Sequence, residues 1–125
     1  MISTINYQIW NEKGILFISF SKNVSLSKEI LHVIKTDIML LSKLEPMPVL
    51  LDFSSINNID ADARKLIADK TFMSRINAVA FLVKDVLQKL LVQSILMVNR
   101  PAFPAKMFEK KEEGEQWLSF YKWVN

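Results

Sequence analysis

The amino-acid sequence predicts an α/β fold, in which a mixed, mostly parallel sheet starts with an N-terminal antiparallel hairpin and is flanked by helices. Strand-like and helix-like segments alternate along most of the chain, which requires crossover connections between parallel strands. The apolar run at residues 77–83 has the unbroken character of a strand that is buried on both faces. With 125 residues, of which 50% are hydrophobic, the chain is expected to form one domain over residues 1–125.

The first elements are predicted to be a hairpin and a long helix. An alternating segment at residues 5–9 and an apolar run at residues 15–20 flank a turn with Gly14, a residue suited to positive φ. Apolar residues then recur at helical spacing over residues 26–43, with Ser25 as the expected N-cap.

The middle of the chain is predicted to alternate strand, helix and strand. A strand over residues 48–53 is followed by a polar turn and by a helix over residues 61–73, for which Asp60 is the expected N-cap. The strand at residues 77–83 comes next.

The last third is predicted to hold two helices and a short strand. Asp85 is expected to cap a helix over residues 86–98, and a strand at residues 105–108 precedes a helix over residues 110–123. This last helix is expected to place four apolar residues on one side and to expose Trp123 as a contact; the four are Trp117, Phe120, Tyr121 and Val124.

Composition makes several classes of function improbable. The absence of cysteine removes disulfides, thiol catalysis and cysteine-ligated metals, and the two glycines cannot build a phosphate-binding loop or a dinucleotide fingerprint. His32 falls outside the apolar stripe of its helix and is expected to face water. Because it is the single histidine, a classical zinc site is not expected. We therefore expect no metal and no cofactor.

Charge and hydropathy indicate where the chain acts. Its 16 basic and 13 acidic residues give a net charge of +3 and are interspersed, so no basic stripe predicts a nucleic-acid partner. Residues 1–6 lack the features of a signal peptide, and no window has the roughly 18 apolar residues that a membrane span needs. We expect a cytoplasmic protein without a membrane span.

The polar segment after the strand at residues 48–53 is the first place to look for a site. In open α/β sheets, ligands and partners bind beyond the carboxyl ends of the parallel strands. Asp52 either contacts a ligand there or accepts backbone N–H groups from the turn at residues 54–58. Ser54 and Ser55 have no histidine base nearby in the sequence and lie in no nucleophile elbow, so a serine hydrolase is not expected.

The order of elements and four sequence segments resemble the STAS fold of anti-sigma factor antagonists, the SpoIIAA-like group. The segments are the strand end LLDFSSI, the helix start DADARKLIA, the strand AVAFLV and the late segment NRPAFPAKMF. The chain resembles most closely an uncharacterised bacterial branch of STAS-like proteins, and the resemblance covers nearly its whole length.

The resemblance implies a regulatory module that works through a protein partner. In signalling STAS domains, a partner kinase phosphorylates a hydroxyl residue in the loop that leads into the helix. The equivalent positions here are Asp60, Ala61, Asp62 and Ala63, so the hydroxyl is missing and the carboxylate of Asp62 stands near the place of the phosphate. A carboxylate carries less charge than a phosphate, and the phosphorylation switch is not expected in this chain.

We therefore expect a non-enzymatic STAS-like module with a surface that binds a protein partner. The expected surface contains Ser54, Ser55, Asn57, Asn58, Asp60, Asp62, Arg64 and Lys65. Asp60 and Asp62 also have a purely structural interpretation. Asp60 is then the N-cap of the helix, and Asp62 is an acid in its first turn, favoured by the helix dipole.

The segment at residues 86–98 is apolar around most of its circumference, which leaves three interpretations open. It is a well-buried helix, a subunit interface of a homodimer, or one wall of a lipid-like pocket such as the related CRAL-TRIO fold has. The expected self-association or ligand face contains Val92, Ile95 and Leu96. A carrier of a small apolar ligand, with its pocket beside this helix, is thus the alternative function.

Overall fold

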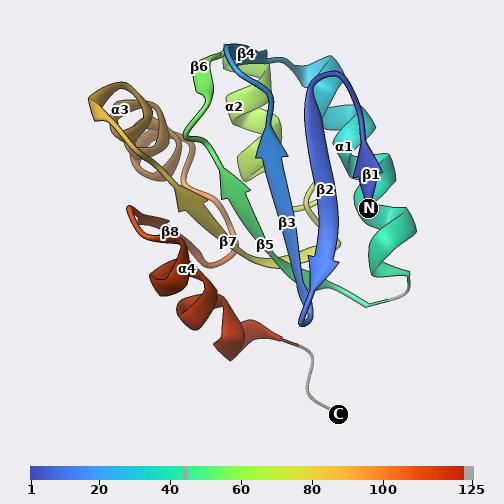
Figure 1. Ribbon diagram of the computed structural model, residues 1–125. Helices are drawn as coiled ribbons and strands as arrows, with labels where there is room; N and C mark the ends of the chain where they lie inside the picture. The colour runs from blue at the N-terminus through green and yellow to red at the C-terminus, as the bar shows by residue number, and fades with distance from the viewer. Residues whose placement is uncertain (44, 123–125) are drawn as a thin grey trace.

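The computed structural model describes residues 1–43 and 45–122 and contains a six-stranded mixed sheet. The strand order is β1-β2-β3-β5-β7-β8 (Figure 1). β1 to β3 are antiparallel neighbours, and β3, β5, β7 and β8 run parallel, which confirms the predicted mixed sheet with its N-terminal hairpin. The strands are β1 Ile2–Ser3, β2 Tyr7–Glu12, β3 Ile15–Phe20, β5 Met47–Asp52, β7 Ile76–Leu82 and β8 Ala105–Phe108.

Two short strands that were not predicted form a second small sheet. β4 (Val24–Leu26) pairs in parallel with β6 (Ile56–Ile59), at the end of the molecule toward which the parallel strands point (Figure 1). The predicted turn at residues 54–58 is therefore wrong in part. The ends of β6, Ile56 and Ile59, are buried, while its two asparagines are exposed.

The first helix, α1, spans Lys28–Ser42, and its N-cap is Ser27 in place of the expected Ser25. The Oγ atom of Ser27 accepts the N–H of Ile30 at 3.3 Å. Leu26 is fully buried in β4, so the strand continues past Ser25 and the helix begins later than predicted.

The second helix, α2, spans Ala61–Ala68 and ends five residues before the predicted end at residue 73. The side chain of Asp69 accepts the N–H of Phe72 at 2.8 Å and so stabilises a turn where the helix was expected to continue. This turn returns the chain to β7.

The third helix, α3, spans Val86–Ser94 and continues as a π-helical turn over Ile95–Asn99. Its predicted cap is confirmed, because Asp85 Oδ1 accepts the N–H of Gln88 at 3.3 Å. The predicted range of residues 86–98 thus holds two kinds of helix. A π turn changes the angular phase of the side chains that follow it.

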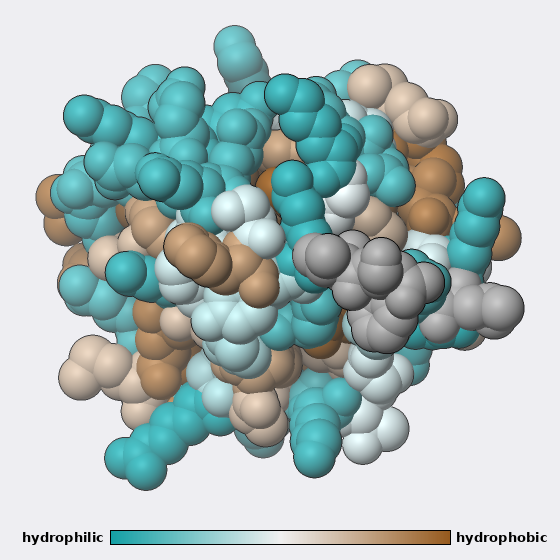
Figure 2. All heavy atoms as spheres, turned by 90° about the horizontal axis from the view of Figure 1, so that it is seen from below, coloured by the Kyte–Doolittle hydropathy of each residue, from teal (hydrophilic) through white to brown (hydrophobic). Residues whose placement is uncertain are grey.

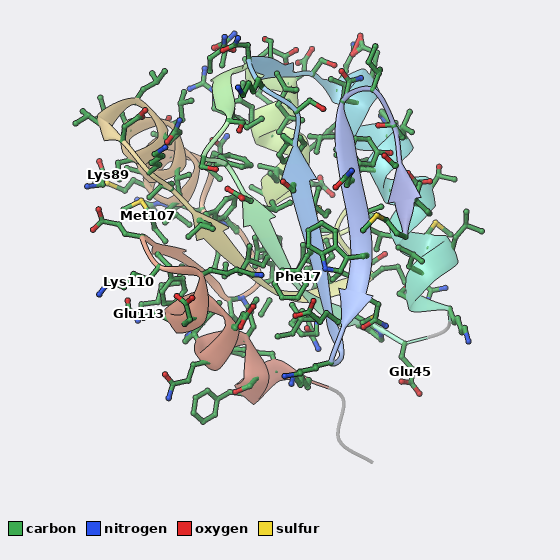
Figure 3. The ribbon with its side chains drawn as sticks, viewed as in Figure 1. Phe17, Glu45, Lys89, Met107, Lys110 and Glu113 are labelled. Atoms are coloured by element: carbon green, nitrogen blue, oxygen red, sulfur yellow. The ribbon has the colours of Figure 1, made fainter. Side chains whose placement is uncertain are left out.

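The helices cover the two faces of the sheet unequally. The larger core cluster joins one face of the sheet to α1, α2 and α3. The smaller cluster joins the other face to α4 (Lys111–Leu118) and includes Phe17 (Figure 3). The molecule therefore has three layers, with α4 alone on its side of the sheet.

α4 packs on the sheet at Gly114, where a side-chain carbon would make ordinary van der Waals contacts. A Cβ atom at Gly114 would lie 3.4 Å from Leu50 Cδ1 and 3.6 Å from Ala80 Cβ. The helix ends at Leu118, and a 3₁₀ turn over Ser119–Tyr121 follows it.

The predicted apolar side of the last helix is confirmed only in part. Trp117 and Tyr121 pack on the smaller core cluster, but Phe120 is 82% exposed because the 3₁₀ turn directs it away from the sheet. Trp123 and Val124 lie outside the described residues.

A tyrosine and a carboxylate join the hairpin to α1. The hydroxyl of Tyr7, a residue that is only 2% exposed, donates a hydrogen bond to Asp37. Burial, and secondly the hydrogen bond to Asp37 and its negative charge, raise the pKa of Tyr7 well above its ordinary value.

The surface and the helix lengths complete the description. Figure 2 views the molecule from the end where the parallel strands begin; hydrophilic side chains cover much of this face, and hydrophobic ones lie in scattered patches. Within residues 1–43 and 45–122, every helix is too short or too polar to cross a membrane.

Candidate interaction site

The predicted site residues lie at the carboxyl end of the parallel strands, but β6 divides them into two groups. Ser54, Ser55 and Asn57 face a crevice beside α3, whereas Asp60, Asp62 and Lys65 belong to the start of α2. Both groups are at the same end of the molecule, near β4 and β6 (Figure 1). We call the eight predicted residues the sheet-end surface: Ser54, Ser55, Asn57, Asn58, Asp60, Asp62, Arg64 and Lys65.

Asp52 supports the turn that carries the first group. Its Oδ1 atom accepts the N–H of Ser54 at 2.9 Å, which is the structural role expected for a carboxylate at a strand end. Phe53 between them is fully buried, so the side chain after β5 anchors the turn in the core. The backbone N–H of Asn23 then donates to the carbonyl of Ser55 at 3.1 Å.

The crevice is open, exposes both polar and apolar atoms, and has a volume of about 360 Å³. Lys22 and Asn23 lie on one side, and Asp85 and Leu87 at the start of α3 lie on the other. Both charged residues are exposed, so the crevice presents a cation, an anion and the two serines to solvent.

Gln88 holds the two sides of the crevice together and was not predicted. Its amide oxygen accepts the N–H groups of Lys84 and Asp85, each at 3.0 Å, and its amide nitrogen donates to the carbonyl of Ser54 at 3.0 Å. Gln88 is 5% exposed. The spacing Asp85-x-x-Gln88 is a capping box and could have indicated the bond from Asp85, but this pattern indicates neither the bond from Lys84 nor the bond to Ser54.

Three side chains at the start of α2 contact the groups around them. Asp60 Oδ1 accepts the N–H of Ala63 at 2.7 Å, which confirms the predicted N-cap. Asp62 lies 3.7 Å from the Nζ atom of Lys28 on α1, and Arg64 donates to the Oγ atom of Ser94 on α3 at 3.3 Å. The helix start is thereby tied to both neighbouring helices, while Lys65 remains exposed.

Solvent reaches most of the sheet-end surface. The side chains of Lys28 and Asp62 are 53% and 63% exposed, so their ion pair contributes little to stability and leaves the carboxylate of Asp62 open to a partner. Asn57 and Asn58 are exposed on β6, and the Nδ2 atom of Asn58 donates a hydrogen bond to the Oγ atom of Ser25 at 3.4 Å. Arg64 is half-buried, and its hydrogen bond to Ser94 links α2 to α3.

His32 lies on α1 and is exposed, as predicted. Its ring packs edge-on against Phe72 at 5.2 Å between centroids. Over the described ranges, no group of three or more His, Cys, Asp or Glu side chains is placed to hold a metal ion.

The face of the helix at residues 86–98 was assigned to the wrong residues. Val92 and Ile95 are fully buried in the larger core, and Leu96 packs against that core, so these residues line no outer face. The exposed apolar residues lie on other positions: Val86, Leu87, Leu90, Met97 and Val98. A nearly all-apolar segment has no periodicity that sets its phase, and the π turn shifts the phase further.

The apolar pocket expected beside this helix lies elsewhere. An apolar pocket is bounded by α1, the sheet and the turn after α2, and none of its lining residues comes from α3. The inner side of α3 is filled by core side chains instead. The carrier hypothesis therefore loses the site that the sequence suggested.

Comparison with known proteins defines the class first by its fold. The structure is similar to the crystal structure of an uncharacterised protein of the DUF3478 family from Shewanella loihica PV-4, which has a SpoIIAA-like fold. The TM-score is 0.60, the sequence identity 17%, and the match covers 94% of this chain and 98% of the other. At this identity the likeness shows the fold alone, and it confirms the resemblance to the SpoIIAA-like group.

The chain belongs to the family described as Domain of unknown function (DUF7793), whose model matches residues 9–122. No curated protein matches the sequence. The family and fold are thus defined by the comparisons, and the function has to be argued from the site.

Proposed function

We propose that this protein is a non-enzymatic STAS-like regulatory module that binds a protein partner through the sheet-end surface. The SpoIIAA-like fold supports this proposal, because the signalling STAS domains that the chain resembles present the same loop and helix start to their partners. Ala61 and Ala63 carry no hydroxyl group, so partner binding here would be independent of phosphorylation at the helix start.

The observation that carries the proposal is the braced and exposed start of α2. The cap at Asp60 and the bond from Arg64 to Ser94 hold the first turns in one position, while Asp62 and Lys65 project into solvent. Charged groups on a rigid element give specificity at low entropic cost, which suits recognition of a partner with complementary charges. The open crevice beside Ser54 and Asn57 adds a recess for a partner side chain.

Site-specific photocrosslinking in the native host tests the proposal. A photoreactive residue at Asn57, Asn58 or Lys65 should trap the same protein, and Asp62→Lys should strongly reduce that product. Gln116, an exposed residue of α4 on the other side of the sheet, is the matched control position and should not trap it.

The pattern of products decides the outcome. A partner trapped equally from Gln116 and from the sheet-end surface, or unaffected by Asp62→Lys, would place the interface elsewhere. If the protein catalysed a reaction that required Ser54 or Ser55, it would be an enzyme, and the proposal of a non-enzymatic module would be wrong.

We also propose that the chain forms a twofold homodimer through the exposed apolar face of α3 and its π turn. The five exposed apolar residues of this segment are 47% to 76% accessible, which is a concentration of apolar surface on one element. A twofold interface covers such a patch with a second copy of itself.

A further inference from the structure

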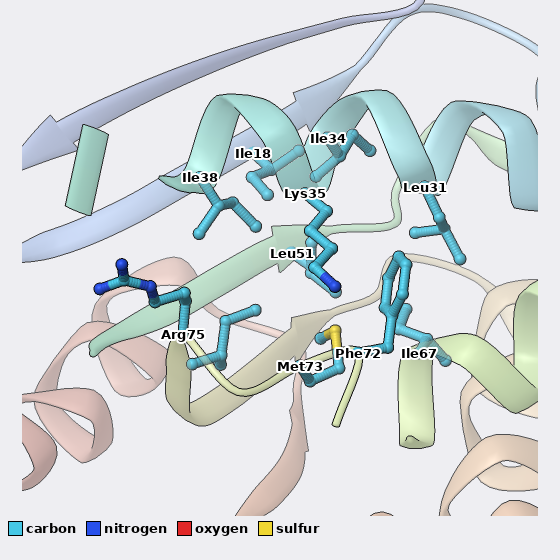
Figure 4. A pocket seen from close by; sticks show the side chains of 11 residues that line it. Ile18, Leu31, Ile34, Lys35, Ile38, Leu51, Ile67, Phe72, Met73 and Arg75 are labelled. Atoms are coloured by element: carbon cyan, nitrogen blue, oxygen red, sulfur yellow. The ribbon is translucent and has the colours of Figure 1, made fainter. Parts of the chain in front are cut away.

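An apolar pocket lies between α1 and the sheet, on the side where the turn after α2 folds back (Figure 4). Ile18 and Leu51 from the sheet form its floor, and Ile34 and Ile38 from α1 form one wall. Phe72 and Met73 from the turn close the opposite wall. All these side chains are hydrocarbon or thioether, so the interior offers no hydrogen-bonding partner to water.

Two cationic side chains stand at the mouth of this pocket. Lys35 on α1 reaches across it toward Phe72, with its Nζ atom 4.8 Å from the centroid of that ring, and Arg75 lies at another side (Figure 4). Among the described residues neither cation has a carboxylate within 4.0 Å. An apolar interior below unpaired cations is complementary to a molecule with an apolar tail and an anionic head.

The Phe72 ring keeps the pocket nearly full. The free interior volume is about 20 Å³, enough for about one water molecule and too little for an alkyl chain. The ring is half-buried on a surface turn and is contacted on its outer side by His32 and Lys35. The backbone of the turn is fixed separately, because Phe72 N–H donates to Asp69 at 2.8 Å and Met73 N–H donates to the Asp69 carbonyl at 2.9 Å.

The side chain of Phe72 takes part in neither of these hydrogen bonds, so a rotation of the ring would leave the backbone of the turn in place. Such a rotation would take the ring out of the lining that it shares with Met73 and Ile67, and it would make room for the tail of a ligand. The head of that ligand would then lie beside Lys35, the cation that extends over the pocket (Figure 4).

We propose that this pocket binds a small amphipathic anion, of the class of medium-chain carboxylates, with Phe72 as a displaceable plug. The tail lies on Ile18 and Leu51, and the carboxylate lies beside Lys35, with Arg75 as a more distant positive charge at the other end of the pocket. This site is separate from the sheet-end surface, and neither proposal depends on the other.

Three ligands with the same tail test the charge of the occupant: octanoate, 1-octanol and octylammonium, titrated into the full chain by NMR. Octanoate should bind most tightly and octylammonium least, with shifts centred on residues of the pocket. Equal affinity for the three, or shifts centred on another surface, would overturn the proposal.

Variants of the two cations test the mouth. Lys35→Met keeps the apolar stem and removes the charge, and it should weaken octanoate about two- to fivefold while leaving 1-octanol unchanged. Arg75→Gln removes the more distant cation and should weaken octanoate less than Lys35→Met does. Lys70→Met, an exposed lysine of the same turn that does not line the pocket, is the control and should change neither ligand.

Phe72→Ala tests the plug and should tighten binding of both octanoate and 1-octanol. Phe72→Leu, which keeps most of the packing, serves if the alanine variant has a lowered denaturation midpoint. Failure of wild type and of both Phe72 variants to bind octanoate would show that the pocket is ordinary core.

Discussion

Asp60 satisfies a backbone group at the start of α2 with one hydrogen bond, from Ala63 N–H to Oδ1 at 2.7 Å. We predict that Asp60→Ala lowers the free energy of unfolding by about 1 kcal/mol, because this N–H loses its partner. Asp60→Asn should cost much less, since the amide oxygen still accepts the bond. Denaturant midpoints of the two variants measure the difference.

Asp62→Ala is the matched control for this prediction. Its exposed ion pair with Lys28, at 3.7 Å, should contribute no more than about 0.5 kcal/mol. If both Asp60 variants had the midpoint of the wild type, the cap would not be stabilising, and a role of that carboxylate in recognition would gain support.

Tyr7 gives the protein a pH dependence on the alkaline side. Burial and the bond to Asp37 raise its pKa in the folded state, so the folded protein holds the phenolic proton more tightly than the unfolded chain does. This stabilisation is complete below the unfolded pKa of about 10 and is lost as the pH rises above it.

We predict that the denaturation midpoint of the wild type falls more steeply above about pH 10 than that of Tyr7→Phe, which has no phenol to titrate. Tyr121→Phe is the control, and it should keep the slope of the wild type. Parallel curves for the wild type and Tyr7→Phe would contradict the prediction.

The residues that sequence reasoning placed correctly act locally. The caps Asp60 and Asp85 bond to N–H groups three residues ahead, which a short pattern can predict. Gln88 bonds to Ser54 across 34 positions, and only the assembled fold brings these two residues together. The central residue of the crevice was therefore missed although its neighbours were predicted.

At the scale of elements, the small sheet shows why some strands escape sequence analysis. β4 has three residues and β6 has four, so neither has enough alternation to be distinguished from a turn. Their pairing depends on the connection from β3 to α1 and the connection from β5 to α2, which come together at one end of the main sheet. β6 then sets the direction in which α2 starts.

The phase of α3 is the element property that decides where its apolar surface lies. We predict that Ile95→Ala, at a fully buried position, lowers the free energy of unfolding by about 2 to 5 kcal/mol. Leu90→Ala, at a position that is 59% exposed, should cost less than about 1 kcal/mol. Urea denaturation of the two variants compares them directly.

A larger loss of stability in Leu90→Ala than in Ile95→Ala would mean that the helical segment buries a different face from the one described. The predicted face of Val92, Ile95 and Leu96 would then have to be considered again. Equal and small effects would indicate that the segment is loosely packed.

For the whole molecule, alternation of elements was sufficient to predict the mixed sheet. The apolar run of β7 lies between β5 and β8, where both faces of the sheet are covered, as its composition indicated. The position of the apolar pocket could not be predicted, because Ile18, Leu51 and Phe72 come from three distant segments. Each of them is an ordinary core residue when considered alone.

Self-association is a property of the whole molecule, and the corrected face of α3 gives it a sharper test. We predict that the wild type sediments as a dimer at micromolar concentration and that Leu90→Lys sediments as a folded monomer, because a charge would be placed in the apolar interface. Leu40→Lys, on α1 at a position that is 66% exposed, is the control and should remain dimeric. A monomeric wild type would exclude the dimer.

The solitary position of α4 on one face of the sheet bears on how the protein is made. A ribosome synthesises every strand that this helix covers before it adds residues 111–118. Ile15, Phe17 and Leu50 therefore cannot be buried by α4 until the helix has been synthesised. During that interval the emerging chain presents an apolar sheet face, the kind of surface that chaperones recognise and that promotes aggregation. The smaller core cluster is complete only when Leu118, at the end of α4, has been added.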